Sequence, residues 1–116
     1  MTTNPYHYAH EKVGAAIASL LLPEIAFEKR LAGAMGELCV AFYVISPPAS
    51  AGKLVEKIKE MVGTGLWQER ARTLTPAERS EVVMAFLELD RAVSREYYMY
   101  EARRDITSMK AGRLPA

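Results

Sequence analysis

The chain has 116 residues, and half of them are hydrophobic, which is enough apolar material for one domain with a buried core. Its 15 Lys and Arg residues nearly balance its 14 Asp and Glu residues, so the formal net charge is +1. This composition disfavours a globally disordered chain and nucleic-acid binding by bulk charge. We expect a single domain over residues 1–116, with a flexible tail over about residues 111–116.

Asn4 followed by Pro5 predicts the beginning of a first helix, since asparagine is a good N-cap and proline suits the first helical position. The apolar spacing continues this helix over about residues 5–22. Pro23 interrupts the pattern because proline lacks a backbone N–H and restricts the residue before it. A second helix is then predicted over about residues 24–45.

The second predicted helix is apolar on nearly every side, which is typical of a central, buried helix. One sector of it carries small residues, so we expect a neighbouring helix to approach closely there. The residues of this sector are Ala26, Gly33, Ala34 and Ala41, with the charged Arg30 and Glu37 between them. The most apolar window, residues 31–45, is shorter than the roughly 20 residues that cross a bilayer, so no membrane span is expected.

A third helix is predicted over about residues 50–62, between two prolines and the sequence Gly63-Thr64-Gly65. Residues 66–74 form a short helical turn in this reading. Trp67 within it is expected to plug the core or cover the ends of the helices.

Thr75, Pro76 and Glu78 form a strong helix-start signal, in which threonine caps and glutamate completes a capping box. No further Gly or Pro occurs until Gly112, which predicts one helix over about residues 76–110. At about 1.5 Å per residue it would be roughly 50 Å long and would outrun its own core. The fold class is therefore an all-α bundle of about four helices with a long C-terminal helix.

Two apolar stripes follow this last helix at about 100° per residue. The first is expected to pack on the other helices and consists of Val82, Phe86, Leu89, Val93, Tyr97 and Tyr100, with Arg104 at its end. The second lies on nearly the opposite side and consists of Tyr98, Met99, Ala102, Ile106 and Met109, with Arg91 and Arg95 as a polar rim. It indicates a homodimer or another protein interface. Wrapping by residues 20–45 within the monomer, or a break in the helix, would also account for it.

Glu37 is isolated in an apolar helix, and an unpaired buried carboxylate is costly. We expect it to be partly buried and paired with Arg30, Arg103 or Arg104. In that case Glu37→Ala would cost about 3–5 kcal/mol by stranding its partner. A functional acid in a small pocket, or an exposed residue at an interface, are the other interpretations.

Other candidates for chemistry are weak. His7 and His10 share a helical face beside Glu11, but a metal site needs more ligands. Cys39 lies in an apolar run and is expected to be a buried structural thiol, which favours a reducing compartment. The sequence contains neither a serine nucleophile elbow nor a phosphate-binding loop, so no cofactor is expected.

Basic residues gather near the C-terminus at Arg103, Arg104, Lys110 and Arg113, where they could touch phosphates or complement the helix dipole. No secretory signal is visible at the N-terminus, so we expect a cytoplasmic protein. The sequence favours a non-catalytic interaction or regulatory protein, a homodimer that acts through the long helix. A nucleic-acid-associated regulator is the first alternative, and a small enzyme or metal protein centred on Glu37 or on His7 and His10 is the second.

Overall fold

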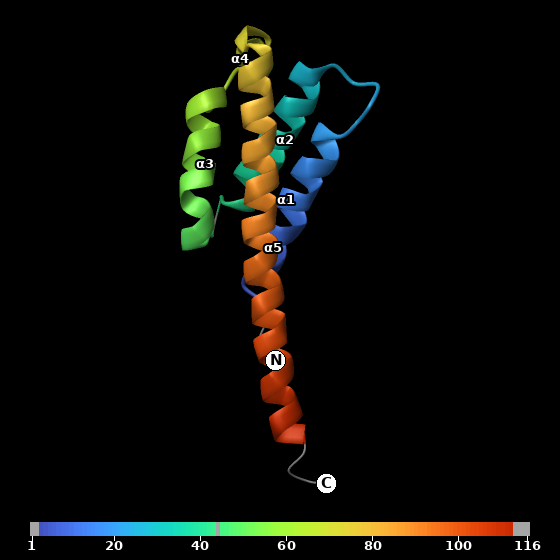
Figure 1. Cartoon of the computed structure of the whole chain (residues 1–116), viewed down its shortest axis with the longest axis vertical. Helices are drawn as coiled ribbons and strands as arrows, with labels where there is room; N and C mark the ends of the chain where they lie inside the picture. Colours follow the sequence, from blue (N-terminus) through green and yellow to red (C-terminus); the bar gives the residue numbers. More distant parts are fainter. Residues whose placement is uncertain (1–2, 44, 113–116) are drawn as a thin grey trace.

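The computed structural model describes residues 3–43 and 45–112, and the side chains of the last helix as far as Met109. These residues form five α-helices and no strand: α1 (His7–Leu20), α2 (Phe27–Ala41), α3 (Ala49–Val62), α4 (Trp67–Thr73) and α5 (Pro76–Gly112). The predicted all-α fold with a long C-terminal helix is confirmed. Figure 1 shows α1, α2, α3 and α5 running alternately up and down, with the short α4 at the upper end of the bundle.

Helices α1 and α2 form a hairpin whose ends are joined by side chains. Ser19 Oγ donates a 3.1 Å hydrogen bond to the carbonyl of Arg30, and Arg30 Nη1 donates a 2.7 Å bond to the carbonyl of Leu20. A Cβ atom on Gly33 would lie only 2.5 Å from Ser19 Oγ. The glycine therefore allows the two helices to approach closely, as the small-residue sector predicted.

Helix α2 is shorter than the apolar pattern predicted, and it is not buried on every side. It begins at Phe27 rather than at residue 24 and ends at Ala41 rather than at residue 45. Val40, Tyr43 and Ile45 are 44%, 88% and 39% exposed, so little of the described apolar run beyond Ala41 is buried, although Phe42 packs partly against the core. Without packing to extend it, the helix stops before Pro47 and Pro48.

The connection between α3 and α5 covers the upper end of the bundle. Gly63 ends α3 with a φ of 84°, a left-handed conformation that glycine adopts without strain. Trp67 Nε1 then donates a 3.1 Å hydrogen bond to the Gly63 carbonyl. The indole is partly buried against the core, while Ala71 and Leu74 are buried beside it. This segment places the start of α5 over the other helices.

Helix α5 begins at the predicted capping box. The Thr75 N–H donates to Glu78 Oε1 at 2.9 Å, and the Glu78 N–H donates to Thr75 Oγ1 at 3.1 Å. The backbone N–H of Thr75 first, and its hydroxyl second, lower the pKa of Glu78 below its ordinary value of 4.5. Two otherwise unpaired donors at the helix start are thereby satisfied.

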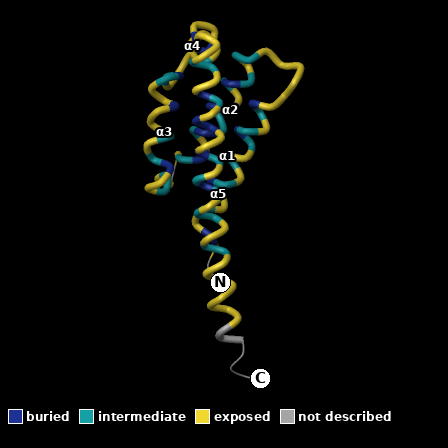
Figure 2. Tube along the Cα trace, viewed as in Figure 1, coloured by how far each residue is buried: buried dark blue, intermediate teal, exposed yellow. Residues whose placement is uncertain are grey.

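The first stripe of α5 packs onto the other helices as predicted. Val82, Phe86, Leu89 and Val93 are fully buried, whereas Tyr97 and Tyr100 further along are only partly buried. The remaining large core side chains come from the other three long helices, and include Val13, Leu31, Met35, Leu38, Ile58 and Val62. Figure 2 shows most of the buried residues in the upper part of the molecule.

The lower part of α5 stands clear of the bundle. At about 1.5 Å per residue, its length is roughly 55 Å, and the molecule measures 63 × 27 × 22 Å. The radius of gyration is 17.0 Å, compared with about 13 Å for a compact domain of this size. Every residue from 102 to 109 is exposed. The predicted projection of the last helix past its core is therefore present.

Candidate functional site

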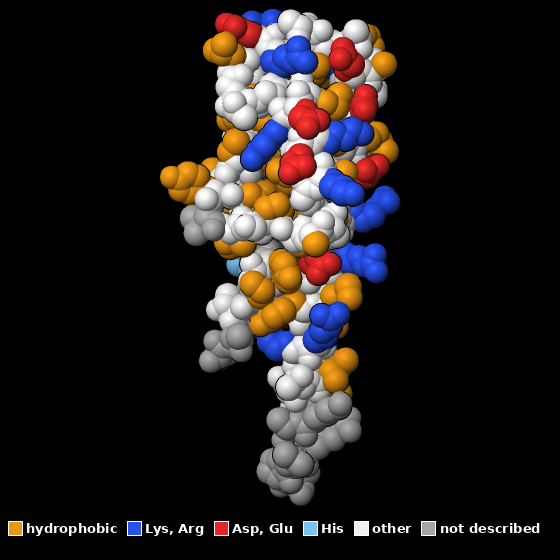
Figure 3. All heavy atoms as spheres, turned by 90° about the vertical axis from the view of Figure 1, so that its left-hand side faces the viewer, with side chains coloured by type: hydrophobic (Ala, Val, Ile, Leu, Met, Phe, Trp, Pro, Cys, Tyr) orange, Lys and Arg blue, Asp and Glu red, His pale blue; other side chains and the backbone are white. Residues whose placement is uncertain are grey.

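The side of α5 that faces away from the core forms a long exposed surface, which we call the outer face. At about 100° per residue its members lie within a sector of roughly 120°. Four of its large apolar side chains are well exposed: Met84 at 54%, Tyr98 at 60%, Ile106 at 53% and Met109 at 59%. Its exposed members include Met84, Leu87, Glu88, Arg91, Arg95, Tyr98, Met99, Ala102, Asp105, Ile106 and Met109. Figure 3 shows hydrophobic side chains exposed along the lower part of the molecule.

The structure brings the five residues of the predicted second stripe together on this face. It leaves them open, because no part of residues 20–43 covers them and α5 continues unbroken to Gly112. Sequence reasoning missed Met84 and Leu87, which extend the same face alongside the bundle. Their helical angle would have found them, since Met84 and Ala102 differ by 18 residues, or five full turns.

Tyr98 lies where α5 leaves the bundle, within a cluster of rings from α1 and α5. The ring of His10 stacks on Tyr97, with centroids 4.4 Å apart and an interplanar angle of 12°. Tyr98 meets both rings edge-on, at 5.4 Å from His10 and 5.1 Å from Tyr97. His10 Nδ1 and Ser94 Oγ share a hydrogen bond of 3.2 Å. These contacts hold the Tyr98 side chain on one side, while most of its surface remains open to solvent.

Asn4 ties the N-terminal segment to the same part of α5. It is the one buried polar residue in the described part of the chain, at 5% exposure. Its Nδ2 donates to the Tyr97 carbonyl and to Glu101 Oε1, both at 3.0 Å, and its Oδ1 accepts from the Tyr6 N–H at 2.9 Å. The prediction that Asn4 caps the first helix is wrong: α1 begins at His7, and its N-cap is Tyr6, without a side-chain cap hydrogen bond.

Glu37 does not pair with an arginine, which corrects the prediction. Its Oε2 lies 3.9 Å from the Nζ of Lys12 on α1, and the two side chains are 36% and 30% exposed. Contact with water screens such a pair, which contributes only about 0–1 kcal/mol. The loss of about 3–5 kcal/mol expected for a stranded buried charge therefore does not apply.

Arg30, predicted as the buried partner of Glu37, binds the C-terminal end of α1 instead. Its guanidinium donates to the Leu20 carbonyl at 2.7 Å and lies over the Phe27 ring, 5.5 Å from the centroid. A positive charge at a helix C-terminus is favourable because it meets the negative end of the helix dipole. Arg30 is thus half-buried because it binds the end of α1.

The two histidines make different polar contacts, although both rings lie near Tyr97, with centroids 6.1 Å away for His7 and 4.4 Å away for His10. His7 is exposed and its Nε2 lies 3.8 Å from Glu11, whereas His10 is held between Tyr97 and Ser94. Among the residues that the structure describes, no three His, Cys, Asp or Glu side chains come close enough together to hold a metal ion.

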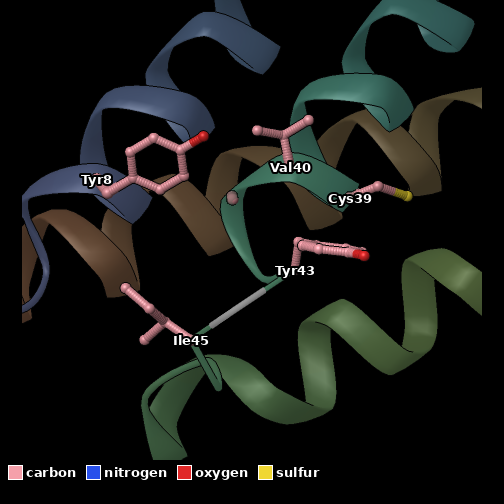
Figure 4. Close-up of a pocket in the computed structure, with 6 residues that line it drawn as sticks. Tyr8, Cys39, Val40, Tyr43 and Ile45 are labelled. Carbon is pink, nitrogen blue, oxygen red and sulfur yellow. The ribbon is translucent and has the colours of Figure 1, made fainter.

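Cys39 is half-buried rather than buried, and it lines an apolar hollow of about 360 Å³ beside the end of α2. Figure 4 shows Tyr8, Val40, Tyr43 and Ile45 around the same hollow. The polar side-chain groups in this lining are the thiol of Cys39 and the phenols of Tyr8 and Tyr43. This set contains no base next to the thiol, so the arrangement does not suggest nucleophilic chemistry.

The basic residues near the C-terminus are only partly described. Arg103 is exposed, and Arg104 Nη2 forms an ion pair with Glu101 Oε2 one turn earlier. The side chains of Lys110 and Arg113, and the predicted flexible tail over residues 111–116, lie outside the described side chains. The charge that Arg104 offers to a phosphate is thereby partly compensated.

No protein-family model matches the sequence, and comparisons with curated proteins and with solved structures find no significant match. The interpretation of the outer face therefore depends on its own geometry. None of the helices in the described part of the chain is both long and apolar enough to span a bilayer.

Proposed function

We propose that this protein is a non-catalytic interaction or regulatory protein that acts through the outer face of α5. One observation carries the proposal: large apolar side chains, with Tyr98, Ile106 and Met109 each more than half exposed, line a helix that projects from its own bundle. Contiguous exposed apolar surface on a soluble domain is typical of a protein interface.

The composition of the outer face supports the same function. Tyr, Met and Arg are among the residue types enriched at protein interfaces, and all three occur on this face. Tyr98 is a suitable anchor because its base is already fixed by the rings of His10 and Tyr97, so less freedom is lost on binding.

The partner we favour is a second copy of this chain. A two-fold interface uses the same patch twice, so one exposed apolar face satisfies both subunits. Every residue of α5 from 102 to 109 is exposed, so a second helix can lie against this part without displacing any other described element.

Light scattering after size exclusion, at tens of micromolar protein, tests this proposal. The wild type is expected to be a dimer. Tyr98→Ala combined with Ile106→Asp is expected to be a monomer with an unchanged helical circular dichroism spectrum, because both side chains lie on the outer face.

Tyr43→Ala is the matched control, since Tyr43 is the most exposed large hydrophobic residue among those described and lies at the hollow rather than on α5. It should leave the dimer intact. A monomeric wild type would refute the homodimer, and a dimer that survives the double substitution would refute the outer face as its interface.

A further inference from the structure

The outer face contains a stripe that is symmetric about Tyr98. Arg91 and Asp105 stand seven residues before and after it, and Leu87 and Met109 stand eleven residues before and after it. At about 100° per residue these five positions fall within a sector of only about 40°. They therefore form one narrow line along the helix, and we call it the symmetric stripe.

The symmetric stripe is open to solvent along its whole length. Leu87 is 40% exposed, Tyr98 60% and Met109 59%, and the charged Arg91 and Asp105 are also exposed. Within the described part of the chain, neither Arg91 nor Asp105 makes an ion pair. These opposite charges are about 21 Å apart along one helix, so they cannot pair with each other within a single chain.

Two copies of the stripe complement one another in one orientation. When the helices run antiparallel and cross at Tyr98, Arg91 of each copy meets Asp105 of the other. The apolar Leu87 likewise meets Met109. When the helices run parallel and in register, like charge meets like charge at both positions, which is unfavourable.

From this complementarity we infer that the partner is a second copy of the chain, whose α5 packs antiparallel on the first with the two-fold axis at Tyr98. The inference rests on the proposed function and specifies its geometry. The projecting end of each α5 then lies along the part of the other α5 that is packed on its own bundle. Both bundles remain on the outside of the paired helices, because the outer face points away from the core.

The pairing sets which residues can be linked by a disulfide. Leu87 of one copy lies beside Met109 of the other, whereas the two Leu87 positions are about 33 Å apart along the helix axis. A disulfide needs Cα atoms within about 7 Å. A cysteine at either position alone therefore cannot link two antiparallel copies.

The cross-linking experiment uses Leu87→Cys and Met109→Cys, each in a Cys39→Ala background that is first shown to dimerise. One variant carries heavy nitrogen, so that mass spectrometry distinguishes the subunits. The two are unfolded together, refolded and oxidised. We expect disulfide-linked dimers that contain one copy of each variant, and no linked dimers from either variant alone.

Charge reversal provides a second readout. Arg91→Asp and Asp105→Arg each place like charges together at two symmetric positions, so each should raise the dissociation constant of the dimer about tenfold. The combined variant Arg91→Asp with Asp105→Arg restores both opposite-charge pairs. Its affinity should return to within about threefold of the wild type.

The outcomes separate this inference from the proposed function. Links within each single-cysteine variant, or failure of the combined charge variant to recover, would overturn the antiparallel register while leaving a dimer through α5 in place. A monomeric wild type, or a dimer insensitive to the Tyr98 and Ile106 substitutions, would overturn both.

Discussion

Replacing Asn4 tests how firmly the N-terminal segment is bound to α5. The side chain is 5% exposed and makes three hydrogen bonds, two of which reach residues more than ninety positions away in sequence. Asn4→Ala removes all three bonds. Asn4→Asp keeps the acceptor for the Tyr6 N–H but removes both donors and places a second carboxylate beside Glu101.

The expected loss of stability follows from the hydrogen-bond partners of Asn4. A neutral hydrogen bond contributes about 0.5–1.5 kcal/mol, and one to a charged group such as Glu101 about 1.5–3 kcal/mol. Water reaches part of this site and replaces some of the lost bonds, so Asn4→Ala should cost about 2–3 kcal/mol in the free energy of unfolding. At about 4 °C per kcal/mol for a chain of this length, Tm should fall by roughly 8–12 °C.

Urea unfolding followed by circular dichroism measures the effect, with Thr3→Ala as the matched control. Thr3 is exposed and adjacent, and its substitution should change the unfolding free energy by less than about 0.5 kcal/mol. Asn4→Asp should cost at least as much as Asn4→Ala at neutral pH, because of repulsion from Glu101. A loss below about 0.5 kcal/mol for Asn4→Ala would refute this reasoning.

Two further predictions concern the helices. Gly33→Ala places its Cβ 2.5 Å from Ser19 Oγ, whereas Gly36→Ala meets nothing within 4 Å; the second should therefore stabilise by about 0.5–1 kcal/mol through helix propensity. Gly33→Ala should lose that gain in the wild type and recover it when measured relative to Ser19→Ala, which itself loses the hydrogen bond to the Arg30 carbonyl; thermal unfolding of these variants would decide this. Because the pKa of Glu78 is lowered by Thr75, its contribution is present above its ordinary value of 4.5 and is lost as the pH falls through the folded-state pKa. The stability difference between the wild type and Glu78→Gln should vanish in acid, and a pH-independent difference would argue against the capping box as its source.

Local signals in the sequence were sufficient for most of the fold. The capping box at Thr75 and Glu78, the glycine stop at Gly63 and the first stripe of α5 all depend on residues within a few positions of one another. Such signals act in the same way in the isolated segment and in the folded chain. They therefore gave the helix order and the projection of α5 correctly.

The errors arise where the partner is distant in sequence. An apolar run does not reveal which of its sides will be covered, so the predicted end of α2 lies beyond Ala41, next to Tyr43 and Ile45, which are exposed. Spacing along one helix likewise suggested Arg30 as the partner of Glu37. The true neighbour is Lys12, which α1 brings into place only after the hairpin has formed. The hydrogen bonds from Asn4 to α5 were not predicted for the same reason, because their partners lie more than ninety residues away in sequence.

Because one helix carries both the core stripe and the outer face, its two roles can be separated by position. Ile106 is 53% exposed and lies beyond the last buried residue of α5, Val93, by more than three turns. Ile106→Asp should therefore change the unfolding free energy of the monomer by less than about 0.5 kcal/mol. Association adds stability by mass action, so Tm of a dimer rises with protein concentration.

We expect that rise in the wild type and its loss in Ile106→Asp, measured by thermal unfolding over a wide dilution series. Val93→Ala is the opposite case, because it removes buried methyl groups and should lower Tm at every concentration while leaving the concentration dependence in place. If Ile106→Asp lowers Tm equally at all concentrations, Ile106 is part of the monomer's own packing. The outer face would then have no separate role in association.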